Sequence, residues 1–148
     1  MIRYAQLKDI FYDNIEKQCF GPYKQKAYFH SIQVCTWCQI LAKKRGLNIE
    51  LASIIGLFHD YSQFLTHNSY KHALTSSEMT YQIIKNLDFT QEEIKIITTA
   101  IRHHSNKDKI DDDYSELIKD ADVLTQYCEE PEAIYPPAKQ ERINRNFH

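Results

Sequence analysis

The hydrophobic positions of the chain are densest between Leu51 and Tyr61, a stretch that reads L-A-S-I-I-G-L-F-H-D-Y. It begins as an apolar run and ends in His59, followed directly by Asp60. A helix that is apolar on every side is one that other elements surround. A buried carboxylate without a partner is costly, so it needs a hydrogen-bond network or a metal. The stretch therefore predicts a central helix whose end is either a satisfied polar core or a metal site.

Five further stretches repeat apolar residues at intervals of three and four, the spacing of an amphipathic helix. Gly21-Pro22 would end the first of these helices, and Gly46 would end the second. The segment Thr90–Glu93 (T-Q-E-E) reads as a capping box, in which both side chains satisfy free backbone N–H groups at a helix start. Besides the central helix, which Asn48 would cap, we expect helices at residues 5–19, 24–45, 72–87, from Thr90 to about His104, and from Asp113 to about Tyr127.

The segments between these helices carry weaker signals. Residues 61–71 (Y-S-Q-F-L-T-H-N-S-Y-K) are polar and poor in periodicity, so we expect a loop there, with His67 as a surface histidine. Residues 105–113 form a charged loop. Residues 128–148, interrupted by three prolines, show no strong pattern and are expected to be a short tail or docking segment.

Composition agrees with helices and excludes several classes. Only three glycines and four prolines in 148 residues are too few for a turn-dense β-sandwich or barrel. This length gives one domain with a real core. We therefore expect an all-α fold, a single domain over residues 1–148 with about six helices and its main body at 24–127.

Charge and hydropathy bear on partners and location. A formal net charge of −2 provides no general attraction to nucleic acid or to an anionic membrane. No apolar run approaches the roughly 20 residues that cross a bilayer, and the N-terminal residues lack a signal-peptide core. We expect a cytoplasmic protein that binds neither nucleic acid nor membrane.

The chain has four cysteines, Cys19, Cys35, Cys38 and Cys128, and a cytoplasmic location makes structural disulfides rare. Cys35-Thr-Trp-Cys38 has the spacing of a redox or zinc motif. It lies, however, within a helical pattern, and no second C-x-x-C completes a zinc site. We expect the cysteines to pack as small apolar residues.

Separate helices place further histidines and aspartates toward the expected interior. His30 belongs to the apolar stripe of its helix, and Asp122 lies beside the buried row of the last one. One inward histidine is usually a satisfied core residue, but several that converge need more partners than packing supplies. Imidazoles with carboxylates suit Zn, Fe, Mn, Ni or Co better than Ca. The candidate metal ligands are His30, His59, Asp60, His72, His104 and Asp122, although periodicity alone does not separate His104 from His103.

The order of these motifs resembles that of the HD-domain superfamily of metal-dependent phosphohydrolases. The segments Y-F-H-S-I-Q-V around His30, L-F-H-D-Y around His59 and K-D-A-D-V-L around Asp122 are similar to its signature segments. The resemblance spans about residues 24–127. It implies that His30, His59, Asp60 and Asp122 bind one metal ion, with Asp60 placed to bridge to a second.

The resemblance also implies ligands for that second ion. K-H-A-L-T-S-S-E and A-I-R-H-H-S-N-K are similar to the segments that supply two more histidines, which nominates His72 and favours His104 over His103. The implied cofactor is one or two divalent ions (Fe, Mn, Zn, Ni or Co). The candidate catalytic residues are Asp60, His72 and His104.

The implied activity is metal-dependent hydrolysis of a phosphoester or phosphoanhydride in a small molecule, by expectation a nucleotide. Within that superfamily the chain most resembles the small bacterial hydrolases of diadenosine tetraphosphate. It differs from their sequence pattern at Ala73 and Ser76-Ser77. Two alternatives stay open: a mixed-valent di-iron oxygenase on the same fold, and a metal- or nucleotide-binding module without turnover. A homodimer is also left open. Candidate phosphate-binding residues are Lys71, Arg102 and Lys107, with Lys139, Arg142 and Arg145 in the tail.

Overall fold

The structure is a computed structural model that describes residues 1–147, and these residues form helices and connecting loops without a strand. The all-α prediction is confirmed, but eight helices replace the expected six. They are α1 (Ile2–Gln18), α2 (Pro22–Arg45), α3 (Ile49–Phe58), α4 (Tyr61–Thr66), α5 (His72–Ile84), α6 (Gln91–His103), α7 (Asp113–Glu129) and α8 (Pro137–Asn146).

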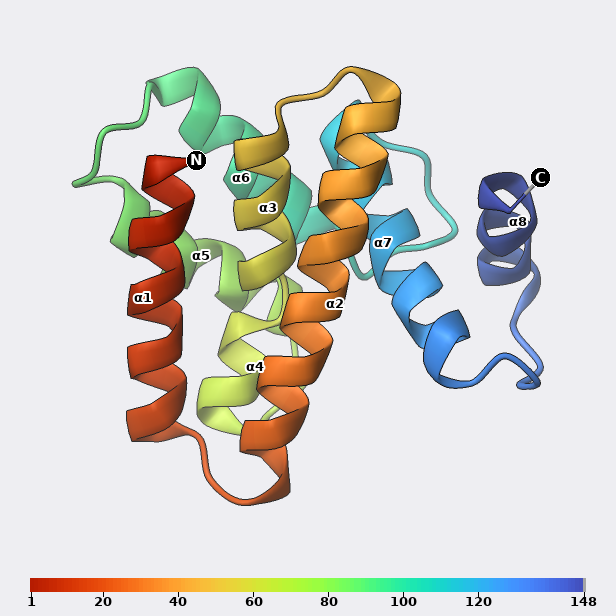
Figure 1. The fold of residues 1–148 in the computed structure, drawn as a ribbon, viewed down its shortest axis with the longest axis horizontal. Coiled ribbons are helices and arrows are strands. Elements are labelled where there is room, and N and C mark those ends of the chain that lie inside the picture. The colour runs from red at the N-terminus through yellow and green to blue at the C-terminus, as the bar shows by residue number, and fades with distance from the viewer. Residues whose placement is uncertain (148) are drawn as a thin grey trace.

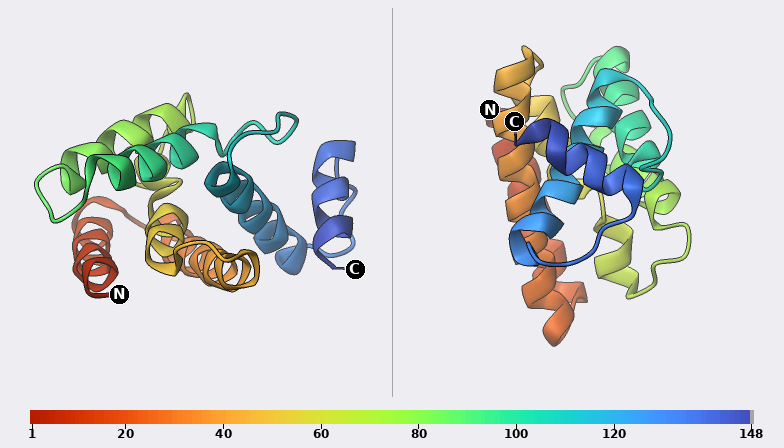
Figure 2. Two further views of the ribbon diagram at one scale, coloured as in Figure 1. Left: turned by 90° about the horizontal axis from the view of Figure 1, so that it is seen from above. Right: turned by 90° about the vertical axis from the view of Figure 1, so that its right-hand side faces the viewer.

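The helices pack in two layers around α3. In Figures 1 and 2, α1, α3 and α2 lie side by side in one layer, and α5 and α6 form the other. α7 packs against α2, α3 and α6, and α8 lies against α7 at the edge of the molecule. Every residue from Leu51 to Phe58 is buried, as expected for a helix that is apolar on every side. The central helix of the sequence is therefore the centre of the fold.

α2 and α3 approach each other closely at one glycine. A Cβ atom on Gly56 would lie 2.9 Å from the Cα atom of Cys35 and 2.9 Å from the Sγ atom of Cys38. Both cysteines are buried, and the Tyr4 hydroxyl lies 3.1 Å from the Cys35 Sγ atom. Within the described residues the C-x-x-C pair thus packs one helix against another, as predicted. Cys128 differs from that prediction, because it is exposed near the end of α7.

Two helices lie where the sequence predicted none. α4 occupies part of the expected loop at 61–71, because Tyr61 and Phe64, one turn apart, are both buried in the core. Six residues are too short to show a helical period. α8 lies in the expected tail, where Ile143 packs with Tyr135 and Val123 in a small second cluster. The tail is therefore a helix docked on α7.

Helix ends follow local capping chemistry, with small shifts. Thr90 and Glu93 form the predicted capping box at the start of α6. The cap of α7 is Asp112, one residue before the expected start, and its side chain accepts hydrogen bonds from Ser115. α5 ends at Ile84, three residues earlier than predicted, and α1 begins at Ile2. Among residues 1–147, no helix combines the length and apolar character that a membrane crossing requires.

Candidate metal centre

The C-terminal end of α3 is the meeting point of the predicted site residues. His59 is the C-cap of α3 and Asp60 is the N-cap of α4, so both lie at the junction of these two helices. The other four side chains come from separate helices: His30 from the middle of α2, His72 from the first residue of α5, His104 from the C-cap of α6, and Asp122 from α7. Segments up to 92 residues apart in sequence therefore converge on one cluster.

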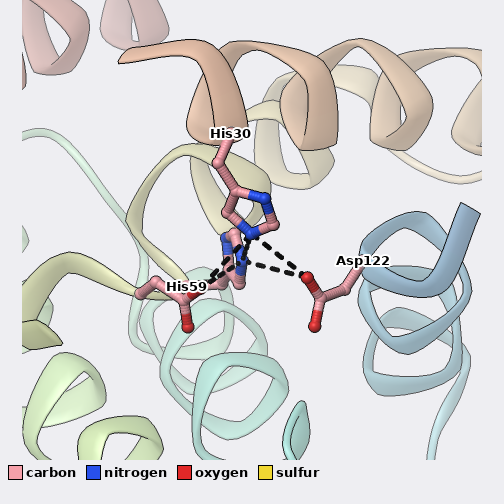
Figure 3. A group of neighbouring side chains, drawn as sticks. His30, His59 and Asp122 are labelled. Carbon is pink, nitrogen blue, oxygen red and sulfur yellow. Dashed lines mark hydrogen bonds and ion pairs between the residues drawn. The ribbon is translucent and has the colours of Figure 1, made fainter. Parts of the chain in front are cut away.

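The first half of the cluster consists of His30, His59, Asp60 and Asp122, whose ligand atoms all lie within 4.8 Å of one another. Figure 3 shows His30 and Asp122 pointing toward each other from α2 and α7, with the His59 ring next to the His30 ring. The His30 Nε2 atom lies 3.1 Å from His59 Nε2 and 3.2 Å from the Asp122 Oδ1 atom. The four side chains thus present one nitrogen or oxygen each to a common point.

The second half consists of Asp60, His72 and His104. The Nε2 atoms of the two histidines lie 3.3 Å apart. Each also lies close to the Asp60 Oδ1 atom, at 3.1 Å for His72 and 3.0 Å for His104. This half is therefore a compact group of two imidazoles and one carboxylate.

Asp60 belongs to both halves and divides its oxygens between them. Its Oδ2 atom lies 3.3 Å from His30 Nε2 and 3.1 Å from His59 Nε2. Its Oδ1 atom faces His72 and His104 instead. A carboxylate placed in this way can bridge two cations with one oxygen on each.

Three of the four histidines are oriented by the backbone. In each of these rings the Nδ1 atom lies at hydrogen-bond distance from a carbonyl oxygen, which can only accept. Nδ1 therefore carries a proton, so Nε2 is the atom whose lone pair a metal would use once the ring is neutral. The pairs are His59 with Gly56 at 2.7 Å, His72 with Ser69 at 3.0 Å, and His104 with Ile101 at 2.7 Å.

In the cluster, neighbouring charged groups offset the cost of burying the two carboxylates. Burial alone would raise the pKa of Asp60, but the neighbouring histidines, His59 first, hold this pKa well below its usual range. Burial likewise opposes ionisation of Asp122, and the Lys107 ammonium leads the contacts that keep its pKa well below normal. For His104, burial prevails and lowers the pKa. Both carboxylates are therefore anionic, which is the form that binds a cation.

The spacing of these atoms fits metal ions. Neighbouring ligands of a first-row ion with bonds of about 2.1 Å are separated by roughly 3.0–3.5 Å. The measured separations are 3.1–3.5 Å in the first half and 3.0–3.3 Å in the second. A cation shared by these lone pairs also removes the repulsion between unprotonated Nε2 atoms that face each other. The residues present therefore fit one divalent ion in each half.

His103 lies outside the cluster. Its Nδ1 atom is 3.2 Å from the Ser115 hydroxyl and 3.7 Å from carboxylate oxygens of Asp111 and Asp112, at the surface. The neighbouring His104 is 1% exposed and faces Asp60. Geometry thus separates the two histidines that periodicity left together. His67 is exposed and stacks on Tyr23, with ring centroids 4.4 Å apart.

The three basic residues nominated for phosphate binding outside the tail are placed differently from one another. The Lys107 Nζ atom donates to the Asp122 Oδ2 atom at 2.8 Å and to the His104 carbonyl at 2.6 Å, so it lies at the edge of the cluster. Lys71 is exposed at the cap of α5, over the ring of Tyr70. Arg102 lines a separate groove between α5 and α6. Of the three, Lys107 alone contacts a residue of the cluster in the part of the chain that the structure describes.

A pocket of about 280 Å³ opens onto the first half of the cluster. Its floor includes His30, Asp60 and Asp122. Sequence reasoning missed the rest of its wall, because these residues belong to no recognised motif. They are Lys26, Gln63, Phe64, Gln126, Glu129 and Glu130.

The comparisons with known proteins agree with this geometry. The family model of the HD domain matches residues 27–127, which is more than half of the chain. The protein therefore belongs to the HD domain family. Its fold is similar to that of a predicted HD superfamily hydrolase from an uncultured Thermotogales bacterium, with a TM-score of 0.65 and 17% identity over 93% of this chain and 84% of that one.

Two further relatives are similar in sequence to this chain over only part of their own length. An uncharacterized protein of Clostridium beijerinckii is 29% identical over 102 residues, 67% of this chain and 64% of that protein. Ribonuclease Y of Geobacter sulfurreducens is 29% identical over 104 residues, 70% of this chain but only 18% of the enzyme. The chain thus spans less than two thirds of either relative.

Proposed function

We propose that the protein is a metal-dependent phosphohydrolase that cleaves a phosphoester or phosphoanhydride bond of a small molecule, such as a nucleotide. The observation that carries this proposal is the division of the Asp60 oxygens between two groups of imidazoles. A bridging carboxylate between two His-rich groups is the ligand arrangement that two-metal hydrolysis requires. Membership of the HD domain family and the fold of the HD superfamily hydrolase support the same reaction class.

Bound divalent ions would supply a lowered pKa for coordinated water and compensation for charge on the phosphoryl oxygens. The chain's own part is to present six ligands in fixed orientation: four imidazole Nε2 atoms, three of them set by backbone carbonyls, and two carboxylates. Lys107 places an ammonium beside Asp122, where it can bind a phosphoryl oxygen with an N–H that its two protein contacts leave free.

The pocket favours a small substrate over a polynucleotide. Its volume of about 280 Å³ is at the lower end for small-molecule sites. Three exposed charged residues line the pocket, Glu129, Glu130 and Lys26, so its mouth carries more negative than positive side chains. The relationship to ribonuclease Y supports cleavage of a phosphodiester, but an acidic mouth repels the phosphates that flank the scissile bond in a long RNA. Diadenosine tetraphosphate is one substrate to test, on the resemblance noted above.

The test uses protein purified without chelator, its metal content, and three substrates: bis(p-nitrophenyl) phosphate, diadenosine tetraphosphate and a short oligoribonucleotide. We expect hydrolysis of at least one small substrate that depends on Mn or Fe, and its loss in Asp60→Asn, which keeps the shape of the side chain but removes the anionic bridge. Hydrolysis by Asp60→Asn at the wild-type rate would overturn the site assignment. Absence of bound metal under any loading condition would overturn the function.

A second function is favoured by one specific observation. The group of His72, His104 and Asp60 is a set of two histidines and one carboxylate, which is also the ligand set of non-haem iron oxygenases. An oxygenase would consume dioxygen in proportion to substrate and would need iron, whereas a hydrolase would release its products anaerobically with Mn. Oxygen uptake by the iron-loaded protein, measured beside anaerobic hydrolysis, separates the two. Metal binding without either reaction would mean that the protein is a binding module without turnover. The cytoplasmic location and the homodimer stay predictions.

A further inference from the structure

Arg142 of α8 is buried in the interface between α8 and the loop that follows α6. Its side chain is 5% exposed, although the sequence suggested a phosphate-binding residue in a tail. The Nη1 atom donates to the Asp120 Oδ1 atom at 2.8 Å and to the Glu116 Oε1 atom at 3.0 Å. This places the guanidinium on α7 by two charge-assisted hydrogen bonds. Arg142 is therefore not free to meet a substrate.

The other side of the same guanidinium holds a backbone carbonyl. The Nη2 and Nε atoms of Arg142 donate to the Lys107 carbonyl at 2.9 Å and 3.3 Å. Lys107 lies in the loop between α6 and α7, where no helix fixes the backbone. A planar fork with N–H donors on two sides suits this task, because it can clamp a carboxylate and a carbonyl at once. α8 thus fixes the backbone of Lys107 to α7.

The side chain of Lys107 continues this path into the cluster. Its Nζ atom binds the Oδ2 atom of Asp122, while the Oδ1 atom of that carboxylate faces His30. An unbroken line of contacts therefore runs from Arg142 to the Lys107 backbone, through its side chain to Asp122, and so to the first half of the cluster.

We propose that Arg142 is a positioning residue that acts on the metal centre through Lys107: it fixes the loop so that the Lys107 ammonium stays beside Asp122, where it binds the phosphoryl group of the substrate. This inference rests on the proposed function for the substrate, but the clamp on the loop does not. It gives α8 a role in the site although the side chains of α8, like that of Lys107, are not among those that line the pocket over the cluster.

Removal of Arg142 leaves its carboxylate partners paired, so the variants are expected to fold. Asp120 keeps Arg45 at 2.6 Å and Arg145 at 3.3 Å. Glu116 keeps the buried Lys119 at 3.1 Å. No carboxylate of this interface would therefore be left as an isolated buried charge, which is the costly outcome of breaking such a network.

The experiment compares Arg142→Met and Arg142→Lys with the matched control Arg145→Met. Arg145 also pairs with Asp120 but, among the described residues, has no hydrogen bond to the loop. Two readouts are used: backbone hydrogen exchange of residues 105–111, and the affinity of the metal-loaded protein for inorganic phosphate measured by calorimetry. Arg142→Lys keeps a charge for Asp120 but loses the second arm, which separates docking of α8 from the clamp on the carbonyl.

We expect both Arg142 variants to increase exchange in the loop and to weaken phosphate binding about tenfold, the scale of a lost charge-assisted hydrogen bond. Arg145→Met should change neither. In a Lys107→Met background, Arg142→Met should cause no further loss of phosphate affinity, because its effect passes through Lys107. Equal losses in both backgrounds, or unchanged exchange in the loop, would overturn the inference. If the metal-loaded wild type binds no phosphate, the proposed function fails, and loop exchange still decides whether the clamp exists.

Discussion

The Nε2 atoms of His72 and His104 face each other at 3.3 Å, while both rings direct Nδ1 toward a backbone carbonyl, Ser69 for the first and Ile101 for the second. Two neutral rings held in this way oppose lone pairs at short distance. Asp60 adds a third acceptor to the same point. Either one ring takes an extra proton or a cation binds all three atoms. The second choice satisfies every acceptor at once, and this makes the pair a sensitive place to test metal binding.

His104→Ala should therefore remove one metal ion and leave the other. We expect the bound metal to fall from about two ions per chain to about one, since His30, His59 and Asp122 remain for the first half. The matched control is His103→Ala, whose ring lies at the surface beside Ser115. Elemental analysis of both variants gives the answer. Loss of metal in His103→Ala with retention in His104→Ala would show that the second half of the cluster is wrongly assigned.

Close packing at Gly56 should be needed for both stability and the site. A methyl group there would meet Cys35 and Cys38 at 2.9 Å, and α3 would have to move away from α2. We expect Gly56→Ala to lower the free energy of unfolding by about 1–3 kcal/mol, the usual scale of overpacking. It should also weaken metal binding, because His30 lies on α2 and His59 ends α3. Urea unfolding and metal titration measure the two effects.

Cys38→Ala supplies the control for that prediction. It removes the Sγ contact but leaves the contact with the Cys35 backbone. The double variant Gly56→Ala with Cys38→Ala should therefore recover only part of the lost stability. Full recovery, or no loss in Gly56→Ala alone, would show that the two helices can separate freely at this point.

Local signals allowed much of the fold to be predicted from the sequence. The apolar run of α3 and the capping box at Thr90 act within a few residues, so they are visible in the chain. α4 and α8 were missed because tertiary contacts stabilise them. One of the contacts that dock α8 is the pair of Arg142 with Asp120, 22 residues away. No local pattern reports such a contact.

For the candidate site, too, one part could be predicted from the sequence and another part could not. The kinds of side chain that form the cluster could be predicted, because histidines and aspartates are unusual on apolar helix faces. The sharing of the Asp60 oxygens and the separation of His103 from His104 depend on how α5 and α6 meet α3, and spacing alone does not give this. Arg142 was a candidate for phosphate binding because its charge is visible in the sequence and its burial is not.

The acidic mouth of the pocket should select against long polyanions. Reversal of charge in the double variant Glu129→Lys with Glu130→Lys is expected to raise kcat/KM for an oligoribonucleotide several-fold, with little change for bis(p-nitrophenyl) phosphate. The gain should shrink as salt increases, because exposed charges are screened. Glu92→Lys, an exposed change at the other end of α6 from His104, is the control. An equal gain in Glu92→Lys would mean that net charge matters and the mouth does not.

The ion pair of Arg3 with Glu93 should make stability fall in acid over a defined range. The Arg3 guanidinium, with the Thr90 backbone N–H, lowers the pKa of Glu93 from 4.5 to about 2. A carboxyl group whose pKa is lower in the folded state contributes stability that is fully present above its unfolded pKa and is lost as pH falls through the folded value. The contribution should therefore disappear between about pH 4.5 and pH 2.

Glu93→Gln tests this directly, because glutamine can still serve the capping box at Thr90 but cannot pair with Arg3 as an ion. At pH 7 we expect the variant to be less stable by about 1 kcal/mol, after allowance for solvent screening of a partly exposed pair. The difference from the wild type should shrink as the pH falls below about 4.5 and be mostly lost by pH 2, where Glu93 is half protonated in the folded state and fully protonated in the unfolded state. Urea unfolding of both proteins at a series of pH values measures the difference. A difference that stays constant from pH 7 to pH 2 would show that the charge of Glu93 contributes nothing, and that its loss acts through the helix cap instead.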